Sequence, residues 1–422
     1  MMSKEKRRVP KLRFPGFTED WEQRKLGDFY TFKNGLNKEK VYFGYGDSIV
    51  NFTDVFHNRQ IYSSTLKGKV FVNKKELENF KVKEGDLFFT RTSETIDEIG
   101  FPAVVMEPME HVVFSGFVLR GRAEKNDPLV NIFKSYIFFT DNFRSEMKKK
   151  SSMTTRALTS GTALKEMYFS YPKDLEEQTK IGEILLRLDN VITLHQRKLD
   201  NLKLKKKALL QKLFPKNGER YPELRFPGFT DAWEQRKLGS IGSTYTGLSG
   251  KTKEDFGHGE AQYITYLNVF QNTISDITMT DKVEIDTTQN EVKYGDVLFT
   301  TSSETPEEVG MSSVWLGDTP NIYLNSFCFG FRPNQKIDPY FLGYSLRAPY
   351  MRDKIKILAQ GISRYNISKN KVMELEISLP NNNEQKLLGD FLQHIDLIIT
   401  LHQRKLDHLQ LQKKALLQQM FV

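Results

Sequence analysis

The feature that most constrains the fold is a repeat that extends over the whole chain. Residues 12–27 read LRFPGFTEDWEQRKLG and residues 224–239 read LRFPGFTDAWEQRKLG, with fourteen of sixteen positions identical. A second pair, LHQRKLDNLKLKKKALLQKLF at 194–214 and LHQRKLDHLQLQKKALLQQMF at 401–421, shares sixteen of twenty-one positions. Because the offsets of 212 and 207 are nearly equal, the 422-residue chain is one unit of about 210 residues written twice.

Similarity varies along the repeated unit. Weaker pairs lie between the strong ones: EGDLFFTRTSETIDEIG (84–100) with YGDVLFTTSSETPEEVG (294–310), and TRALTSGTALKEMYFSYP (155–172) with SRYNISKNKVMELEISLP (363–380). Residues 30–83 and 241–293 hardly align. The near-identical ends are therefore expected to do the same job twice, whereas the interiors do different jobs.

Each half of the repeat divides into a β-rich part and a long helix. The β-rich parts, 20–172 and 232–380, contain short runs such as DLFFT, PAVVM, DVLFT and SSVWL, closely punctuated by glycine, proline and asparagine. Helical stretches such as PLVNIFKSYIFFTDNFRSEMKKK interrupt these runs. Strands and helices mixed in this way indicate an α+β fold.

The remainder of each half has the spacing of a coiled-coil seam. The seam positions alternate four and three residues apart: Leu188, Ile192, His195, Leu199, Leu202, Lys206, Leu209 and Leu213, then Leu388, Leu392, Ile395, Ile399, His402, Leu406, Leu409, Lys413, Leu416 and Met420. EEQ at 176–178 and NEQ at 383–385 follow YPKD and LPNN, where helices should begin. Each predicted helix has about 38 residues and a length of about 57 Å.

Two such helices in one chain are expected to pair with each other. An antiparallel pair would place the two β-rich domains at opposite ends of a rod and give the molecule a pseudo-twofold axis. His195 with His402, and Lys206 with Lys413, interrupt the two seams at matching places. Polar seam residues can fix the register of a coiled coil, or they can simply face solvent at its edge. The sequence leaves both roles open.

The opening segment of each half reads as framework. It precedes each variable region, and its aromatic residues are expected to seat that region on the helices. These apolar anchors are Phe14, Phe17 and Trp21 in the first copy, and Phe226, Phe229 and Trp233 in the second.

Composition narrows the class of partner and the compartment. The net charge of +9 and the pI near 9.2 favour a polyanion, nucleic acid before membrane. The single cysteine, Cys328, excludes an internal disulfide and fits a reducing compartment. The basic N-terminus lacks the apolar stretch of a signal peptide, and no run approaches eighteen apolar residues. We therefore expect a soluble, cytoplasmic chain.

Sequence motifs of catalysis are missing. The chain contains neither a GxxxxGK[ST] phosphate loop nor a GxGxxG loop, and its seven histidines and one cysteine lack metal-ligand spacing. SxxK occurs five times, a frequency that chance explains. The pattern is typical of a binding protein, and we predict no catalytic residue, no metal and no cofactor in this chain.

Candidate phosphate- and base-contacting residues lie in four segments. MKKKSSMTTR (147–156) combines basic and hydroxyl side chains without an acid, although a solvated helix end would look the same. FFTRTSET (88–95), LFTTSSET (298–305) and QGISRYNIS (360–368) supply side chains able to read base edges. The candidate DNA contacts are Arg91, Thr92, Ser93, Lys148, Lys149, Lys150, Thr155, Arg156, Thr301, Ser302, Ser303, Arg364, Tyr365 and Asn366.

Together these features resemble the DNA-specificity subunit of type I restriction–modification systems. The resemblance rests on the WEQRKLG entries, the EGD and YGD strands, the YP/LP–EQ helix starts and the two LHQRKLD coils, and it covers essentially the whole chain. It implies the following division: an N-terminal segment (1–19), a first target-recognition domain (20–172), a central spacer helix (173–216), a linker that repeats the anchor (217–231), a second target-recognition domain (232–380) and a C-terminal spacer helix (381–422).

The resemblance also implies a function and partners. Each recognition domain would read one half of a split, asymmetric site in double-stranded DNA, and the helices would set the spacing and dock two methyltransferase subunits. Motor and nuclease subunits would join for cleavage. S-adenosylmethionine, ATP and magnesium would belong to those partners.

Two alternatives remain. A self-sufficient restriction nuclease or methyltransferase would need a catalytic cluster that the sequence lacks. A structural coiled-coil adaptor would explain the helices but not two unlike domains on matched scaffolds.

Overall fold

The computed structural model describes residues 8–422, and the chain forms two compact units. Unit 1 comprises Met1–Gln196 and Lys405–Val422, described from residue 8 onward, and unit 2 comprises Arg197–Arg404. Each unit therefore contains one β-rich part and one end of each long helix. Residues 1–7 of the N-terminal segment lie outside the described residues.

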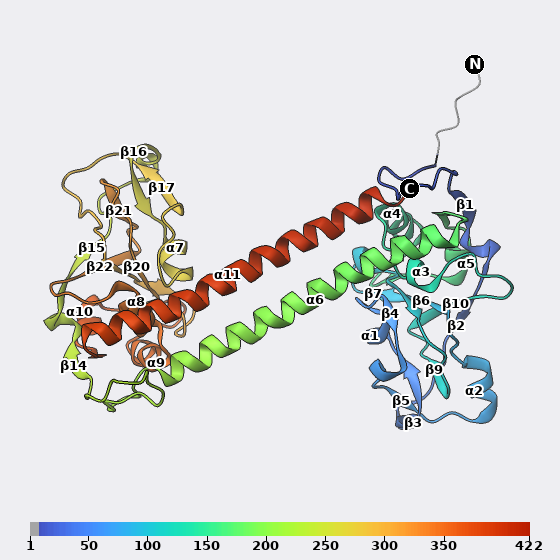
Figure 1. Ribbon diagram of the computed structural model, residues 1–422, viewed down its shortest axis with the longest axis horizontal. Helices are drawn as coiled ribbons and strands as arrows, with labels where there is room; N and C mark the ends of the chain where they lie inside the picture. The colour runs from blue at the N-terminus through green and yellow to red at the C-terminus, as the bar shows by residue number, and fades with distance from the viewer. Residues whose placement is uncertain (1–7) are drawn as a thin grey trace, which may run out of the picture. The chain divides into compact units, whose positions relative to one another are not determined.

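A β-sheet forms the centre of each unit, mixed in unit 1 and antiparallel in unit 2 (Figure 1). In unit 1 its order is β2 (Tyr30–Asn34), β10 (Val118–Ala123), β6 (Leu87–Thr90), β8 (Pro102–Val105) and β4 (Gln60–Ile61), antiparallel except for the β4–β8 pair. In unit 2 the order is β15 (Gly242–Thr246), β22 (Cys328–Pro333), β18 (Val297–Thr300) and β20 (Ser312–Val314). An isolated parallel bridge from Ile274 to Val314 takes the place of β4 in unit 2.

The central strand of each sheet is buried on both faces, which explains its continuous apolar run. All four residues of β6 are buried, and so are all four of β18. Side chains alternate along a strand, so Leu87 and Phe89 enter the core that contains the helices, whereas Phe88 enters a second core on the other face.

A three-stranded sheet flanks each central sheet. Its order is β5 (Lys69–Val70), β3 (Phe43–Val50) and β9 (Val112–Phe114) in unit 1, and β17 (Thr280–Val283), β16 (Phe256–Ile264) and β21 (Ile322–Leu324) in unit 2. In both, the middle strand pairs parallel with the last and carries an irregularity against the first. Residues 30–83 and 241–293, which hardly align, therefore contribute to the same sheet topology. The pattern of apolar residues can specify the same fold without identical side chains.

Short helices complete the two units. Those of unit 1 are α1 (Phe52–Val55), α2 (Lys74–Phe80), α3 (Asn131–Ile137), α4 (Asp141–Lys150) and α5 (Gly161–Lys165). Those of unit 2 are α7 (Tyr266–Gln271), α8 (Pro339–Arg347), α9 (Pro349–Ile357) and α10 (Lys369–Met373). The α+β fold predicted for each part is confirmed.

The repeated segment forms a framework strand in each unit. β1 (Glu22–Lys25) pairs antiparallel with β13 (Tyr168–Tyr171), and β14 (Glu234–Lys237) pairs with β24 (Glu376–Leu379). These pairs join the first and last residues of each β-rich part. Trp21 and Trp233 are among the largest fully buried side chains, and each contacts a helix-end phenylalanine edge-on, Phe421 and Phe214 respectively.

The two long helices have the predicted length and orientation. α6 (Leu175–Lys212) and α11 (Asn382–Gln419) each contain 38 residues. In unit 1, Ile181 and Leu185 share a core with Leu416, so the start of α6 lies beside the end of α11. Lys206 of α6 pairs with Asp396 of α11 at 2.5 Å in unit 2, which shows the same antiparallel arrangement. None of the helices within residues 8–422 is long and apolar enough to cross a membrane.

The structure decides the role of one pair of polar seam residues. Lys206 Nζ binds Asp396, and Lys413 Nζ binds Asp189, the equivalent carboxylate in unit 1. Each ion pair links α6 to α11, so the lysines fix the register and are not edge residues facing solvent. His195 and His402 are both half-buried.

Candidate nucleic-acid interface

The candidate residues of unit 1 gather around a small sheet. β6 ends at Thr90, and after Arg91 the chain forms β7 (Thr92–Ser93). β7 pairs antiparallel with β12 (Ala157–Leu158), which pairs in turn with β11 (Ser152–Met153). Two segments about 60 residues apart are thereby brought together, as a phosphate- and base-contacting surface requires.

Unit 2 repeats this arrangement in the same register. After β18 and Thr301, the chain forms β19 (Ser302–Ser303), which pairs with β23 (Tyr365–Asn366). Ser303 is opposite Tyr365, just as Ser93 is opposite Ala157. The scaffold is thus the same in both units, and the side chains presented on it differ.

Three of the candidate serines are buried, in contrast to the role expected of them. Ser93, Ser302 and Ser303 are each 6% exposed. Ser93 Oγ donates to Glu98 Oε2 at 3.5 Å, and Ser303 Oγ donates to Glu308 Oε2 at 3.4 Å. The SET sequences therefore shape the loops by local side-chain hydrogen bonds, and these hydroxyl groups face inward.

The three candidate lysines lie at the end of α4, which terminates at Lys150. Lys148 Nζ is 2.5 Å from Asp97 Oδ1, Lys150 Nζ is 3.8 Å from Glu146 Oε1, and Lys149 is exposed. Lysines in a last turn also stabilise a helix through its macrodipole. Thr155, Arg156, Arg364 and Asn366 are exposed, while Arg91, Thr92, Thr301 and Tyr365 are half-exposed.

Two half-buried arginines hold the loops through backbone carbonyl oxygens, and neither was among the sequence-based candidates. Arg144 Nη1 donates to the carbonyl oxygen of Gly100 at 2.7 Å, and Arg352 Nη1 donates to that of Gly310 at 2.7 Å. Both glycines have positive φ, 63° and 61°, which suits glycine best. Burial lowers the pKa of each guanidinium to about 10. The sequence indicated this role of the two arginines only through their matching positions in the repeat, in FRSEM and YMRDK.

An aromatic cavity of about 460 Å³ opens beside the loop of unit 1. Its lining includes Phe52, Phe56, Phe117, Thr92 and Arg156. Phe52 and Phe56 stack with ring centroids 5.0 Å apart, and both project from α1 or the residue after it. None of these phenylalanines was among the sequence-based candidates.

The corresponding place in unit 2 is arranged differently. Tyr266 and Phe270 stack at 5.9 Å, as Phe52 and Phe56 do in unit 1. The hydroxyl of Tyr266 donates to the carbonyl oxygen of Ser302 at 2.7 Å. Phe52 has no such hydroxyl, so this bond is specific to unit 2.

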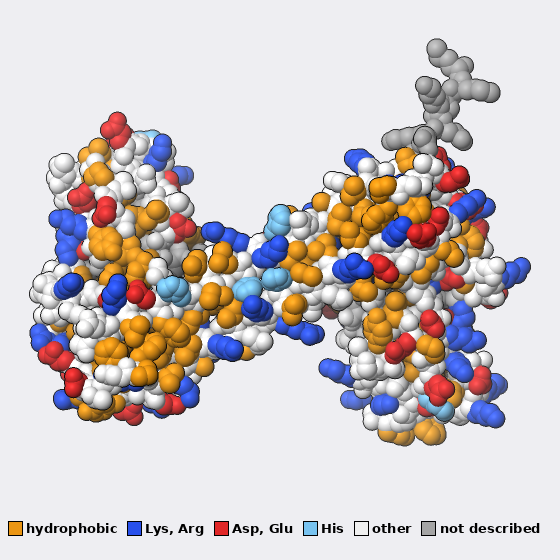
Figure 2. Space-filling view, in the orientation of Figure 1, with side chains coloured by type: hydrophobic (Ala, Val, Ile, Leu, Met, Phe, Trp, Pro, Cys, Tyr) orange, Lys and Arg blue, Asp and Glu red, His pale blue; other side chains and the backbone are white. Residues whose placement is uncertain are grey.

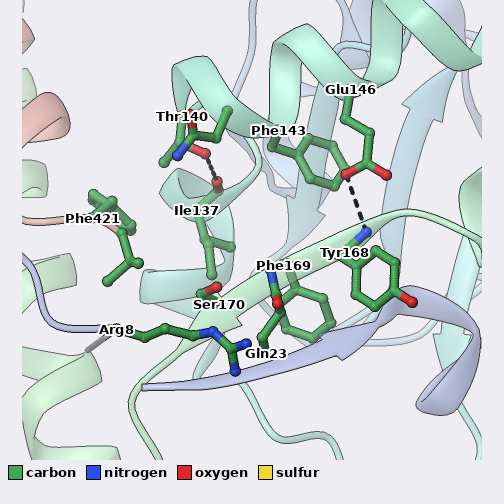
Figure 3. A pocket seen from close by; sticks show the side chains of 12 residues that line it. Arg8, Gln23, Ile137, Thr140, Phe143, Glu146, Tyr168, Phe169, Ser170 and Phe421 are labelled. Atoms are coloured by element: carbon green, nitrogen blue, oxygen red, sulfur yellow. Dashed lines mark hydrogen bonds between the residues drawn. The ribbon is translucent and has the colours of Figure 1, made fainter. Parts of the chain in front are cut away.

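A second cavity in unit 1, of about 260 Å³, belongs to the framework (Figure 3). Arg8 and Gln23 lie on one side of it, Glu146 of α4 lies on the opposite side, and Phe421 closes one end. Glu146 accepts a hydrogen bond from the backbone N–H of Tyr168 at 3.2 Å. The cavity lies where the repeated segment, α4 and the chain end meet, and nothing in it resembles a catalytic group.

Titratable residues do not assemble into a reactive centre in the part of the chain that the structure describes. Among residues 8–422 there is no group of three or more His, Cys, Asp or Glu side chains placed to hold a metal ion. Cys328 is buried, and desolvation raises the pKa of its thiol well above the ordinary value. The ion pairs Arg122–Asp86 (2.5 Å) and Arg332–Asp296 (2.6 Å), each with a buried carboxylate, occupy equivalent places in the two central sheets.

Exposed apolar residues occur at matching places on the long helices. Val191 and Leu194 of α6 in unit 1 correspond to Ile398 and Leu401 of α11 in unit 2, and all four are exposed. In unit 1 a groove of about 510 Å³ lies between the two helices, and its lining includes Val191 of α6 and Leu416 of α11. Hydrophobic side chains lie among lysines and arginines on this helical surface (Figure 2).

Comparison with known proteins gives one consistent result. The profile of a family described as "Type I restriction modification DNA specificity domain" matches residues 18–204 and again 230–411. The putative type I restriction enzyme MjaX specificity subunit of Methanocaldococcus jannaschii is 24% identical over 425 residues, which cover 94% of this chain and 92% of that protein. The type I restriction enzyme MjaVIII specificity subunit of the same organism is 25% identical over 254 residues, covering 58% and 59%.

A solved structure shares the fold. The crystal structure of the type I restriction–modification system S subunit from M. genitalium superposes with a TM-score of 0.53 at 14% identity, covering 98% of this chain and 99% of the other. Both halves of the repeat thus match one family, and a solved protein shares the fold.

Proposed function

Because the chain belongs to the type I restriction–modification DNA specificity family, we propose that each of its two units reads one half of a split, asymmetric DNA site. As a member of this family the chain is the non-catalytic subunit that recognises the DNA sequence. The observation that carries the proposal is the matched pairing of β7 with β12 and of β19 with β23. One scaffold presents different side chains in the two units.

The differences at matched positions support asymmetric reading. Arg91 in unit 1 corresponds to Thr301 in unit 2, and Leu158 in β12 corresponds to Asn366 in β23. Arginine can donate two hydrogen bonds to guanine, and asparagine pairs in the same bidentate way with adenine. Identical half-sites would not need these exchanges.

The proposed contacts are the exposed and half-exposed candidates in the two loops, in the segments that pair with them and at the end of α4. They are Arg91, Thr92, Lys148, Lys149, Lys150, Thr155, Arg156, Thr301, Arg364, Tyr365 and Asn366. The buried Ser93, Ser302 and Ser303 support the loops from within.

The equivalent pair Arg156 and Arg364 offers a matched test. In the complex assembled with its methyltransferase subunits, R156A should relax the bases accepted in one half-site, and R364A those in the other. A bidentate base contact contributes about 1–3 kcal/mol of discrimination. Selection of bound duplexes from a random pool, followed by sequencing, would measure both halves at once, so each variant is the control for the other.

Two outcomes would contradict the proposal. Selection by the unaltered complex that returned a palindrome or one uninterrupted block would exclude split, asymmetric reading. Equal relaxation of both half-sites in each variant would exclude the assignment of one half-site to each unit.

The matched exposed residues on the helices support two equivalent docking sites. We assign these to two methyltransferase subunits, because Val191 and Leu194 in unit 1 recur as Ile398 and Leu401 in unit 2 and apolar patches of this kind mark interaction surfaces. V191D/L194D should reduce the stoichiometry from two methyltransferase subunits to one, measured by native mass spectrometry. An unchanged stoichiometry of two would refute this site.

The remaining partners and the compartment follow from the same proposal. The methyltransferase subunits would carry S-adenosylmethionine, and motor and nuclease subunits would carry ATP and magnesium. The purified chain alone should neither methylate nor cut DNA when supplied with these cofactors. A cytoplasmic location accords with double-stranded DNA as the ligand.

A further inference from the structure

Two phenylalanine rings stand exposed at equivalent positions in the two units. Phe117 precedes β10 and is 62% exposed, and Phe327 precedes β22 and is 57% exposed. Single exposed apolar residues are ordinary on protein surfaces. The same ring at the same place on two scaffolds, next to both candidate reading loops, calls for a shared role.

The backbone at each ring is fixed by hydrogen bonds to the reading loop. The carbonyl oxygen of Phe117 accepts from Arg91 N at 3.0 Å, and its N–H donates to Ser115 Oγ at 3.3 Å. These contacts fix the backbone from which the ring projects, while most of the ring remains in solvent.

Unit 2 reaches the same result with different side chains. The carbonyl oxygen of Phe327 accepts from both Thr301 N at 2.9 Å and Thr301 Oγ1 at 2.8 Å, and its N–H donates to Asn325 Oδ1 at 2.8 Å. Asn325 replaces Ser115 and Thr301 replaces Arg91, yet the aromatic residue and its attachment are retained.

The surroundings of Phe117 suit a flat, partly polar ligand. Its ring lines the aromatic cavity together with Phe52 and Phe56, and Thr92 and Arg156 supply polar groups at the same cavity. A nucleobase has apolar faces and hydrogen-bonding edges. Stacking of a base on an aromatic side chain contributes about 1–3 kcal/mol.

This inference rests on the function proposed above: we propose that Phe117 and Phe327 are wedge residues, whose rings separate stacked bases. Each ring stacks against a nucleobase in the half-site read by its own unit and displaces that base from its neighbour in the duplex. In the first half-site the displaced base enters the cavity lined by Phe52 and Phe56. Proteins that insert apolar side chains between base steps unstack them in this way.

The test uses the complex with methyltransferase subunits and duplexes that carry one 2-aminopurine at successive positions of the recognition site. Methylated adenines are left unsubstituted, because the methyltransferase itself extrudes those bases. Unstacking raises 2-aminopurine fluorescence. The unaltered complex should raise it at one position or more in each half-site. F117A should abolish the increase in one half and F327A in the other.

Affinity gives a second readout. Each alanine variant should weaken specific binding by about 5- to 150-fold, which corresponds to the stacking contribution of one base. F117W and F327W retain an aromatic face and should keep both affinity and fluorescence. Y168A is the matched control, because Tyr168 is an exposed aromatic residue, 46%, at the framework cavity (Figure 3), and its loss should leave both readouts unchanged.

The outcomes separate this proposal from the proposed function. If the unaltered complex selects a split site but shows no fluorescence increase, and both alanine variants bind within twofold of it, the wedge role is refuted and sequence reading stands. If the unaltered complex shows no sequence preference, the proposed function itself fails. Circular dichroism melting curves of the variants verify that the largely exposed rings are dispensable for folding.

Discussion

Replacing Arg225 with alanine should loosen the second repeated segment more than replacing Arg13 loosens the first. Arg225 binds Glu384 through two hydrogen bonds of 2.7 and 2.8 Å, and Arg13 binds Glu177 at the same two distances. Both carboxylate side chains are only 1% exposed. By distance and burial alone the two ion pairs are equivalent.

An additional hydrogen bond distinguishes the two sites. Trp21 Nε1 donates to Glu177 Oε1 at 3.3 Å. The equivalent indole nitrogen of Trp233 is buried without a hydrogen-bond partner within residues 8–422. After loss of the arginine, Glu177 thus keeps one donor from a side chain, whereas the Glu384 carboxylate loses the arginine that held both of its oxygens.

The magnitudes follow from the cost of an uncompensated buried charge. Removing one partner of a buried ion pair costs about 3–5 kcal/mol, and we expect R225A to lie in this range. A hydrogen bond to a charged group contributes about 1.5–3 kcal/mol. Because the indole bond is long, R13A should cost about 1.5 kcal/mol less than R225A.

Hydrogen exchange of the framework strands measures both costs. Each 1.4 kcal/mol changes the opening equilibrium about tenfold, so protection of β14 in R225A should fall about tenfold further than protection of β1 in R13A. The double variant R13A/W21F should remove the difference, since phenylalanine keeps most of the ring but not the N–H. Equal losses in R13A and R225A, or no effect of W21F in the R13A background, would refute the reasoning.

Three further predictions concern single side chains. The hydrogen bond from Lys148 lowers the pKa of Asp97, so the pair contributes stability above the unfolded pKa of Asp97, and this contribution is lost as the pH falls. K148A should move the NMR titration midpoint of Asp97 upward, and an unmoved midpoint would contradict the pair. Burial raises the pKa of Cys328, so a thiol reagent at pH 8 should modify it only after unfolding in urea, and rapid modification of the native chain would contradict its burial. Y266F should lower the free energy of unfolding of unit 2, measured by urea denaturation, by about 1 kcal/mol, because the bond to Ser302 is lost. F52Y should not destabilise unit 1, and equal losses in both variants would show that ring packing dominates.

The sequence by itself determined the architecture. An internal repeat and a sustained 4–3 apolar spacing are properties of many residues at once, so they identified both β-rich parts, the 38-residue helices and their antiparallel pairing. The alignment of the two halves also matched Arg156 with Arg364. The strand pairs agree with that alignment, because Ala157 pairs with Ser93 in unit 1 and Tyr365 pairs with the equivalent Ser303 in unit 2. The domain boundaries drawn from the sequence stay a prediction.

Only the tertiary structure decided which side chains of the candidate interface face outward. β7 and β19 have two residues each, too few to show the period-two alternation that separates buried from exposed positions, and both residues of β19 are buried. The burial of Ser93, Ser302 and Ser303 therefore could not be read from the sequence. The loop-holding Arg144 and the exposed Phe117 were missed because their partners lie far away in sequence. Lys206 was left undecided for the same reason, since Asp396 lies 190 residues further along the chain and no local pattern records that contact.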